Sequence, residues 1–255
     1  MEHDPFNIVD EMPRKVMTLF YIVDTSGSMS GAKIGALNAA VRETLPIIEE
    51  ISKTNSDSKI KVSVLEFSSG CEWMYPTPIE VESFEWRDLQ ASGLTSLGEA
   101  YDELSEKLSH SHGFMNEATG SFAPVIILLS DGAPTDSPEH ALEKLKSNKW
   151  FNVATKVAIA IGNDCLKQTL IDFTGNQEAV LTVHNIDELK KIIRMVSVTA
   201  SRVNSKSVSV GKGAPDKVTD TVKTIQEDIA NDPTLKGIDV GSSTANEKND
   251  DWAGW

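Results

Sequence analysis

Short apolar runs alternate along the chain with longer segments that carry apolar residues at helical spacing. Runs at 16–23, 60–67, 124–130, 155–161 and 179–183 predict buried strands. Apolar positions three and four residues apart predict helices over 32–52, 97–108 and 187–203. A further helix is expected to begin near Pro138, with Asp136 or Ser137 as its cap, and a short one to follow Asp164.

Strands that alternate with helices predict an α/β fold with a doubly wound, mostly parallel sheet. The segment 72–75 follows a Ser-Ser-Gly turn and predicts one short antiparallel edge strand. We expect this domain to span residues 16–203, after an N-terminal lead of residues 1–15 and before a C-terminal tail of residues 204–255.

Composition narrows the range of functions. The 255 residues are 40% hydrophobic, which suffices for a sizeable core. The net charge of −14 argues against nucleic acid and anionic membranes as partners, since both attract basic surfaces. Two cysteines, Cys71 and Cys165, are too few for a disulfide framework. Neither a signal pattern nor an apolar stretch of membrane-spanning length is visible, so we expect a cytoplasmic protein.

The C-terminal tail is expected to lie outside the folded domain. Residues 205–213 have the composition of a linker, 214–229 have helical spacing, and 241–251 are polar. Trp252 and Trp255 stand beside two aspartates and are possible docking anchors. On this interpretation, truncation after Ser205 leaves a folded domain. Two alternatives stay open: the tryptophans are incidental, or Val218, Val222 and Ile225 pack back on the domain.

The strongest chemical signal is Asp24-Thr25-Ser26-Gly27-Ser28, directly after the first apolar run. Asp24, Ser26 and Ser28 alternate, so their oxygens can converge on one point, and Gly27 permits a sharp bend. An all-oxygen set suits Mg²⁺, Mn²⁺ or Ca²⁺ and disfavours zinc and copper. An octahedral site of this size favours Mg²⁺ first and Mn²⁺ second.

Two further segments supply the remaining ligands. Asp131 follows the strand at 124–130, and Thr95 precedes the helix at 97–108. In open α/β sheets, sites lie beyond the carboxyl ends of the strands, where Asp24 and Asp131 are expected. The alternative is a purely structural role, in which Asp24 and the serines cap a helix and Asp131 forms a turn. Capping does not account for all these positions together.

This constellation resembles the metal-ion-dependent adhesion site of the von Willebrand factor A (vWA) domain. The Asp-x-Ser-x-Ser motif, the loop threonine and the aspartate after a strand occur in the family's order. The resemblance implies that the hydroxyls bind the ion directly and the aspartates often act through water. It also implies an open coordination position, which an acidic side chain of a protein partner fills.

Several stretches look like the bacterial TerY group: 19–30, 64–69, 94–98 and 130–136. That resemblance implies tellurite resistance or stress response, beside a protein kinase and a PP2C-type phosphatase. The alternative is an adaptor or scaffold of an ATPase complex, a role that other bacterial vWA proteins fill.

Enzyme classes fit less well. Phosphatases of the haloacid dehalogenase type need a second acidic residue where Ser26 stands. Phosphate-binding and nucleophile-elbow motifs are absent from the sequence, and the metal motif offers no catalytic base. We therefore predict a metal-dependent protein-interaction module and not an enzyme, with a metal-dependent hydrolase as a distant alternative.

Overall fold

A computed structural model describes residues 13–109, 112–117, 119–163, 167–207 and 214–241. The strands are β1 (Lys15–Asp24), β2 (Ser58–Phe67), β3 (Cys71–Trp73), β4 (Ile79–Glu80), β5 (Val125–Ser130), β6 (Thr155–Ile161), β7 (Val180–Val183) and β8 (Asp239–Val240). The helices are α1 (Ala32–Thr54), α2 (Leu97–Lys107), α3 (Glu139–Lys146), α4 (Lys149–Val153), α5 (Lys167–Thr174), α6 (Ile186–Asn204) and α7 (Ala214–Asn231).

Within the described residues, all strands join one sheet in the order β3-β2-β1-β5-β6-β7-β8, with β4 also paired to β2. The central strands β2, β1, β5, β6 and β7 run parallel, which confirms the predicted fold class. The expected antiparallel edge strand is β3. Two more short antiparallel strands, β4 and β8, were not expected from the sequence.

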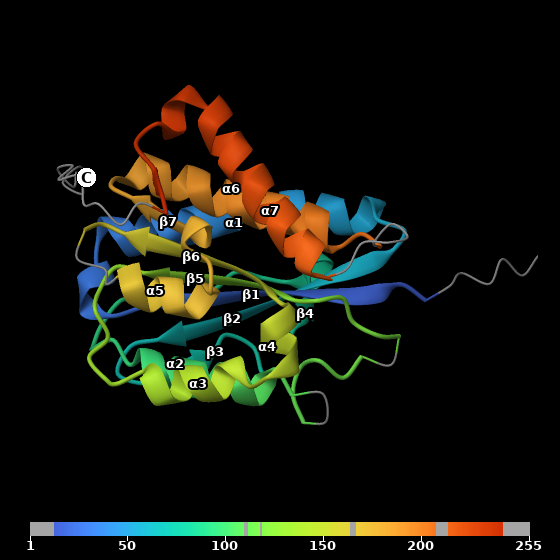
Figure 1. The fold of residues 1–255 in the computed structure, drawn as a ribbon, viewed down its shortest axis with the longest axis horizontal. Helices are drawn as coiled ribbons and strands as arrows, with labels where there is room; N and C mark the ends of the chain where they lie inside the picture. The colour runs from blue at the N-terminus through green and yellow to red at the C-terminus, as the bar shows by residue number, and fades with distance from the viewer. Residues whose placement is uncertain (1–12, 110–111, 118, 164–166, 208–213, 242–255) are drawn as a thin grey trace, which may run out of the picture.

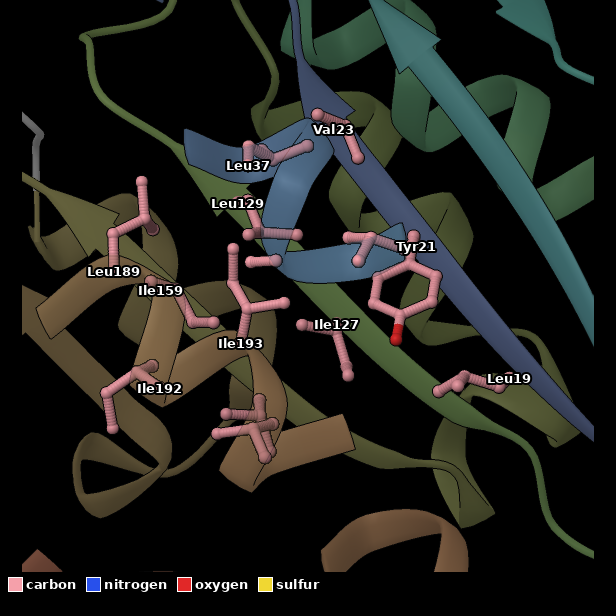
Figure 2. Packing of buried hydrophobic residues seen from close by; sticks show 14 of the residues in the cluster. Leu19, Tyr21, Val23, Leu37, Ile127, Leu129, Ile159, Leu189, Ile192 and Ile193 are labelled. Atoms are coloured by element: carbon pink, nitrogen blue, oxygen red, sulfur yellow. The ribbon is translucent and has the colours of Figure 1, made fainter. Parts of the chain in front are cut away.

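Helices cover both faces of the sheet: α1 and α6 lie on one face, and α2, α3, α4 and α5 lie on the other (Figure 1). Because successive side chains of a strand point to opposite faces of the sheet, β1 contributes to the cores on both faces. Leu19, Tyr21 and Val23 enter the core beneath α1 and α6, whereas Phe20 and Ile22 enter the opposite core. The first of these cores is shown in Figure 2, where side chains of β1, β5 and β6 meet those of α1 and α6.

The packed body continues past Val203, the boundary expected from the sequence. Helix α7 lies across α6 (Figure 1), and Ile225 and Ile229 join the core beneath it. Strand β8 then pairs with β7 and extends the sheet. The expectation of a separate tail is therefore wrong for residues 214–241, because the narrow apolar stripe of α7 finds a partner face on α6. Trp252 and Trp255 lie outside the described residues.

One predicted helix cap is also corrected. Pro138, and neither Asp136 nor Ser137, occupies the cap position of α3. Asp136 instead accepts a 2.8 Å hydrogen bond from the backbone N–H of Gly98, in the first turn of α2. A carboxylate at a helix N-terminus is favourable wherever it comes from in the sequence. Across the described residues, no helix is long and apolar enough to cross a membrane.

Candidate metal centre

Asp24 lies at the carboxyl end of β1 and is fully buried. Its Oδ1 accepts a 2.9 Å hydrogen bond from the backbone N–H of Ser26, and its Oδ2 accepts a 2.6 Å bond from the Ser130 hydroxyl. The first bond closes the turn that follows the strand, and the second ties β1 to the end of β5. Each oxygen of the Asp24 carboxylate is therefore held by a hydrogen bond.

The two serines of the motif lie beside this carboxylate. Their hydroxyl oxygens, Ser26 Oγ and Ser28 Oγ, are 3.0 Å apart. Ser26 is buried, whereas Ser28 is exposed, so the hydroxyl pair leads from the interior to the surface. The Ser28 hydroxyl donates a 2.6 Å bond to Asp131 Oδ1, which brings the second predicted aspartate into the same cluster.

Thr95 reaches the cluster from a third loop. Its backbone N–H donates to the Thr135 hydroxyl at 3.1 Å, and its carbonyl accepts from the Thr135 N–H at 2.9 Å. A Cβ placed on Gly132 would lie 3.8 Å from Ser28 Oγ and 3.9 Å from Thr95 Oγ1. Both hydroxyls therefore lie beside the backbone that follows Asp131, within van der Waals reach of a Cβ at this position. The structure thus brings all five predicted site residues to one edge of the sheet.

Backbone contacts hold the three loops at fixed positions. The N–H of Gly27 donates to the carbonyl of Gly93 at 3.0 Å, and a Cβ on Gly27 would meet that carbonyl at 3.4 Å. Gly93 has a φ of 81°, a left-handed conformation that favours glycine. A Cβ there would also lie 2.6 Å from Ser69 Oγ, so the close approach of these loops requires glycine at Gly93.

The electrostatics of the cluster favour a cation beside the two carboxylates. Burial raises the pKa of the Asp24 carboxyl above its ordinary value, against the opposing effect of hydrogen bonds from Ser130 and Ser26, and the nearby Asp131 adds to the rise. A buried carboxylate of this kind is stabilised by a positive charge beside it. Asp131 already has one: the Lys33 ammonium lies 2.7 Å from its Oδ2.

The donor atoms fit a hard divalent cation. In the described part of the chain, no three His, Cys, Asp or Glu side chains gather closely enough to hold an ion. Any ion at this edge therefore relies on hydroxyl oxygens as well as on the two carboxylates. Ligands at ~2.1 Å around an octahedral ion are about 3.0 Å from their neighbours. The Ser26 and Ser28 hydroxyls, which are hydrogen-bonded to each other at 3.0 Å, already lie at a spacing that such an ion accepts.

Sequence reasoning missed several residues that shape the cluster. Ser130 and Thr135 hold Asp24 and Thr95 in place, and Lys33 pairs with Asp131. Ser130 ends β5 and Thr135 lies in the loop after Asp131, but a serine or threonine at such a position carries no distinctive signal. Lys33 carried one, because a cation in the first turn of a helix opposes the helix dipole.

Comparisons with known proteins agree with this architecture. The human collagen alpha-6(VI) chain is 29% identical over 157 residues, which is 58% of this chain and 7% of the collagen chain. A von Willebrand factor type A protein from Catenulispora acidiphila has a TM-score of 0.55 at 17% identity, over 74% of this chain and 43% of that one. Such low identity shows the fold alone.

A second similar solved structure is proximal thread matrix protein 1 from the mussel byssus, with a zinc-occupied MIDAS motif (metal-ion-dependent adhesion site). It has a TM-score of 0.54 at 19% identity, over 72% of this chain and 48% of that one. This chain thus spans less than half the length of each of these three relatives. The profile of the von Willebrand factor type A domain matches residues 19–195, from β1 into α6. The chain therefore belongs to the von Willebrand factor type A domain family.

Proposed function

We propose that this protein is a metal-dependent protein-interaction module. Members of its family often serve protein–protein interaction, and the cluster at the sheet edge gives this chain a specific means of doing so. Asp24, Ser26, Ser28, Thr95 and Asp131 would hold one divalent cation, Mg²⁺ by preference and Mn²⁺ second. The observation that carries the proposal is the convergence of these five oxygen-bearing side chains from three loops.

When bound, the ion supplies Lewis acidity and a coordination position for a ligand from outside the chain. The residues of the chain orient that position. Ser130 and the Ser26 N–H hold both oxygens of buried Asp24, so this carboxylate is engaged toward the interior. Ser28 stands at the surface, which makes its side of the cluster the route of approach.

The partner group that suits this position is a carboxylate. A hydroxyl-rich donor set leaves the charge of a divalent ion incompletely compensated, so an anionic oxygen ligand is favoured. Leu94 precedes Thr95 and is 59% exposed, which places an apolar side chain on the loop next to the centre. An Asp or Glu side chain flanked by an apolar residue therefore fits this rim. Truncating one partner of a buried charged contact typically costs about 2–5 kcal/mol.

We propose binding rather than catalysis for this centre. Among the described residues, serine hydroxyls, a backbone N–H and the paired ammonium of Lys33 contact the two aspartates. None of these groups is suited to act as a general base at neutral pH. The zinc-occupied MIDAS motif of the mussel protein supports the view that this fold can hold a divalent ion, and it adds zinc to the ions worth testing.

For the cellular setting, we propose a cytoplasmic stress-response or tellurite-resistance complex that contains a protein kinase and a PP2C-type phosphatase. The support is the likeness of residues 19–30, 64–69, 94–98 and 130–136 to the TerY group. A kinase or phosphatase surface with an exposed acidic residue would be the docking partner. Metal-dependent turnover of a substrate by this protein after purification would count against the whole proposal.

Affinity capture with the full chain tests the proposal. Wild-type protein is offered to native lysate in Mg²⁺ or in EDTA, beside a Ser26→Ala plus Ser28→Ala variant. Ser30→Ala is the matched control, since Ser30 lies on the same loop and is exposed, and its hydroxyl contacts the Ala91 carbonyl instead of the cluster. We expect a kinase or phosphatase to be retained by wild type and Ser30→Ala in Mg²⁺ only. Retention that is equal in EDTA would contradict a metal-dependent interface.

A further inference from the structure

Both oxygens of the Asp131 carboxylate are engaged by side chains of this chain. Ser28 donates to Oδ1 at 2.6 Å, and the Lys33 ammonium donates to Oδ2 at 2.7 Å. The Asp131 side chain is fully buried, and that of Lys33 is only 18% exposed. The ion pair is thus shielded from water, unlike the exposed pair of Lys53 with Glu49 at the other end of the same helix.

Local structure gives no reason for a lysine at this position. Lys33 is the second residue of α1, and that first turn holds no acidic residue. The unpaired N–H groups of a helix N-terminus attract anions and repel cations. Holding a long side chain in one rotamer also costs conformational entropy. The pairing with Asp131 offsets both costs, so the placement of Lys33 is explained by the cluster and not by the helix.

Resting on the metal centre proposed above, we propose that Lys33 is a built-in counter-cation that competes with the divalent ion for Asp131. Without the ion, the ammonium neutralises one of two neighbouring carboxylates. With the ion, the ammonium either moves off Asp131 or remains as a like charge nearby. In both cases Lys33 weakens metal binding relative to a chain that lacks this charge.

The formal charges of the centre show what Lys33 achieves. With both carboxylates counted as ionised, these two groups and the Lys33 ammonium leave a single negative charge before a divalent ion arrives, and a single positive charge afterwards. One carboxylate from a partner would then bring the total to zero. Lys33 therefore makes the isolated chain a weak metal binder and leaves the loaded centre with a charge that suits an acidic group.

Calorimetric titration of the full chain with Mn²⁺ tests the inference. We expect Lys33→Met to bind Mn²⁺ at least about tenfold more tightly than wild type, and Lys33→Glu more tightly again. Lys53→Met removes an exposed lysine of the same helix and should leave the affinity unchanged. Equal or weaker binding by Lys33→Met would overturn the inference, because a merely structural lysine would not restrain the metal.

A second variant covers the case in which Lys33→Met fails to fold, since it leaves a buried carboxylate unpaired without metal. Lys33→Arg keeps the charge and can pair with Asp131 through two N–H groups, so its affinity for Mn²⁺ should not exceed that of wild type. Tighter binding by Lys33→Arg would overturn the inference. Failure of both wild type and Lys33→Met to bind Mn²⁺ would instead refute the metal centre, so the two failures are distinguishable.

Discussion

The Ser28 hydroxyl donates a 2.6 Å hydrogen bond to Asp131, a residue 103 positions further along the chain. The contact is possible because β1 and β5 are parallel neighbours, so the loops that follow them leave the same edge of the sheet. From β1 the sheet grows in both directions, through β2 on one side and β5 on the other. Ligand sites of open α/β sheets lie at such a switch point.

A buried hydrogen bond between the sheet and α6 gives a first prediction. The Tyr21 hydroxyl donates to Ser197 Oγ at 2.7 Å, and both residues are fully buried. Tyr21→Phe leaves the serine without this partner and should lower the free energy of unfolding by about 1–3 kcal/mol. Adding Ser197→Ala should recover part of that loss, since no polar group is then left unsatisfied. Urea unfolding of the two single variants and the double variant measures the coupling, and strictly additive losses would contradict it.

The second prediction concerns α7. Ile225 is 2% exposed and belongs to the core, so Ile225→Ala should cost about 2–5 kcal/mol of stability. Val218→Ala, at a half-buried position of the same helix, should cost clearly less. Truncation after Ser205 removes all of α7 and β8 and should strongly destabilise the domain, contrary to what the sequence predicted. Truncation after Gly241 keeps α7 and β8 and should yield a more stable chain than truncation after Ser205; equal stability of the two truncated chains would contradict the packing.

The third prediction uses the half-buried Lys156 of β6. Its ammonium donates to the Phe151 carbonyl at 2.9 Å, and burial, with repulsion from Lys146, lowers its pKa from 10.5 to about 8. Between these values the unfolded chain holds a proton that the folded chain has released. The contribution of Lys156 to the free energy of unfolding therefore increases as the pH is raised from about 8 to 10.5.

Denaturant unfolding of wild type and Lys156→Met across that range checks the sign. Wild type should gain stability relative to the variant as the pH rises, whatever the constant offset from the lost hydrogen bond. Lys223→Met, at an exposed position on α7, is the control and should show a flat difference. A flat difference for Lys156→Met as well would mean that this ammonium keeps an ordinary pKa in the folded chain.

The sequence was informative where local pattern and tertiary structure agree. Apolar runs such as 124–130 and the helical stripe of 32–52 predicted β5 and α1, because buried parallel strands and amphipathic helices depend on patterns that are local. The proximity of the five candidate site residues was also predictable, since Asp24, Ser26 and Ser28 form one motif and Thr95 and Asp131 occupy expected loops; their role as metal ligands stays a prediction.

What the sequence did not predict depends on contacts between distant segments. Asp136 caps α2 rather than its own helix, and that choice is made by the packing of two loops. Likewise, the stripe of Val222, Ile225 and Ile229 is too narrow to reveal which face will cover it. Lys33 meets Asp131 only because β1 and β5 are adjacent, which is a property of the sheet order.

The central claim is that the cluster around Asp24 is a metal centre, and calorimetric titration of the full chain with Mg²⁺, Mn²⁺ and Ca²⁺ tests it most directly. Wild type should bind one ion, weakly, with Mg²⁺ and Mn²⁺ preferred to Ca²⁺. Asp24→Asn should fold with unchanged circular dichroism and bind none, because it keeps the shape of Asp24 without its charge. Equal binding by both chains, or tight Ca²⁺-preferring binding by wild type, would contradict the account.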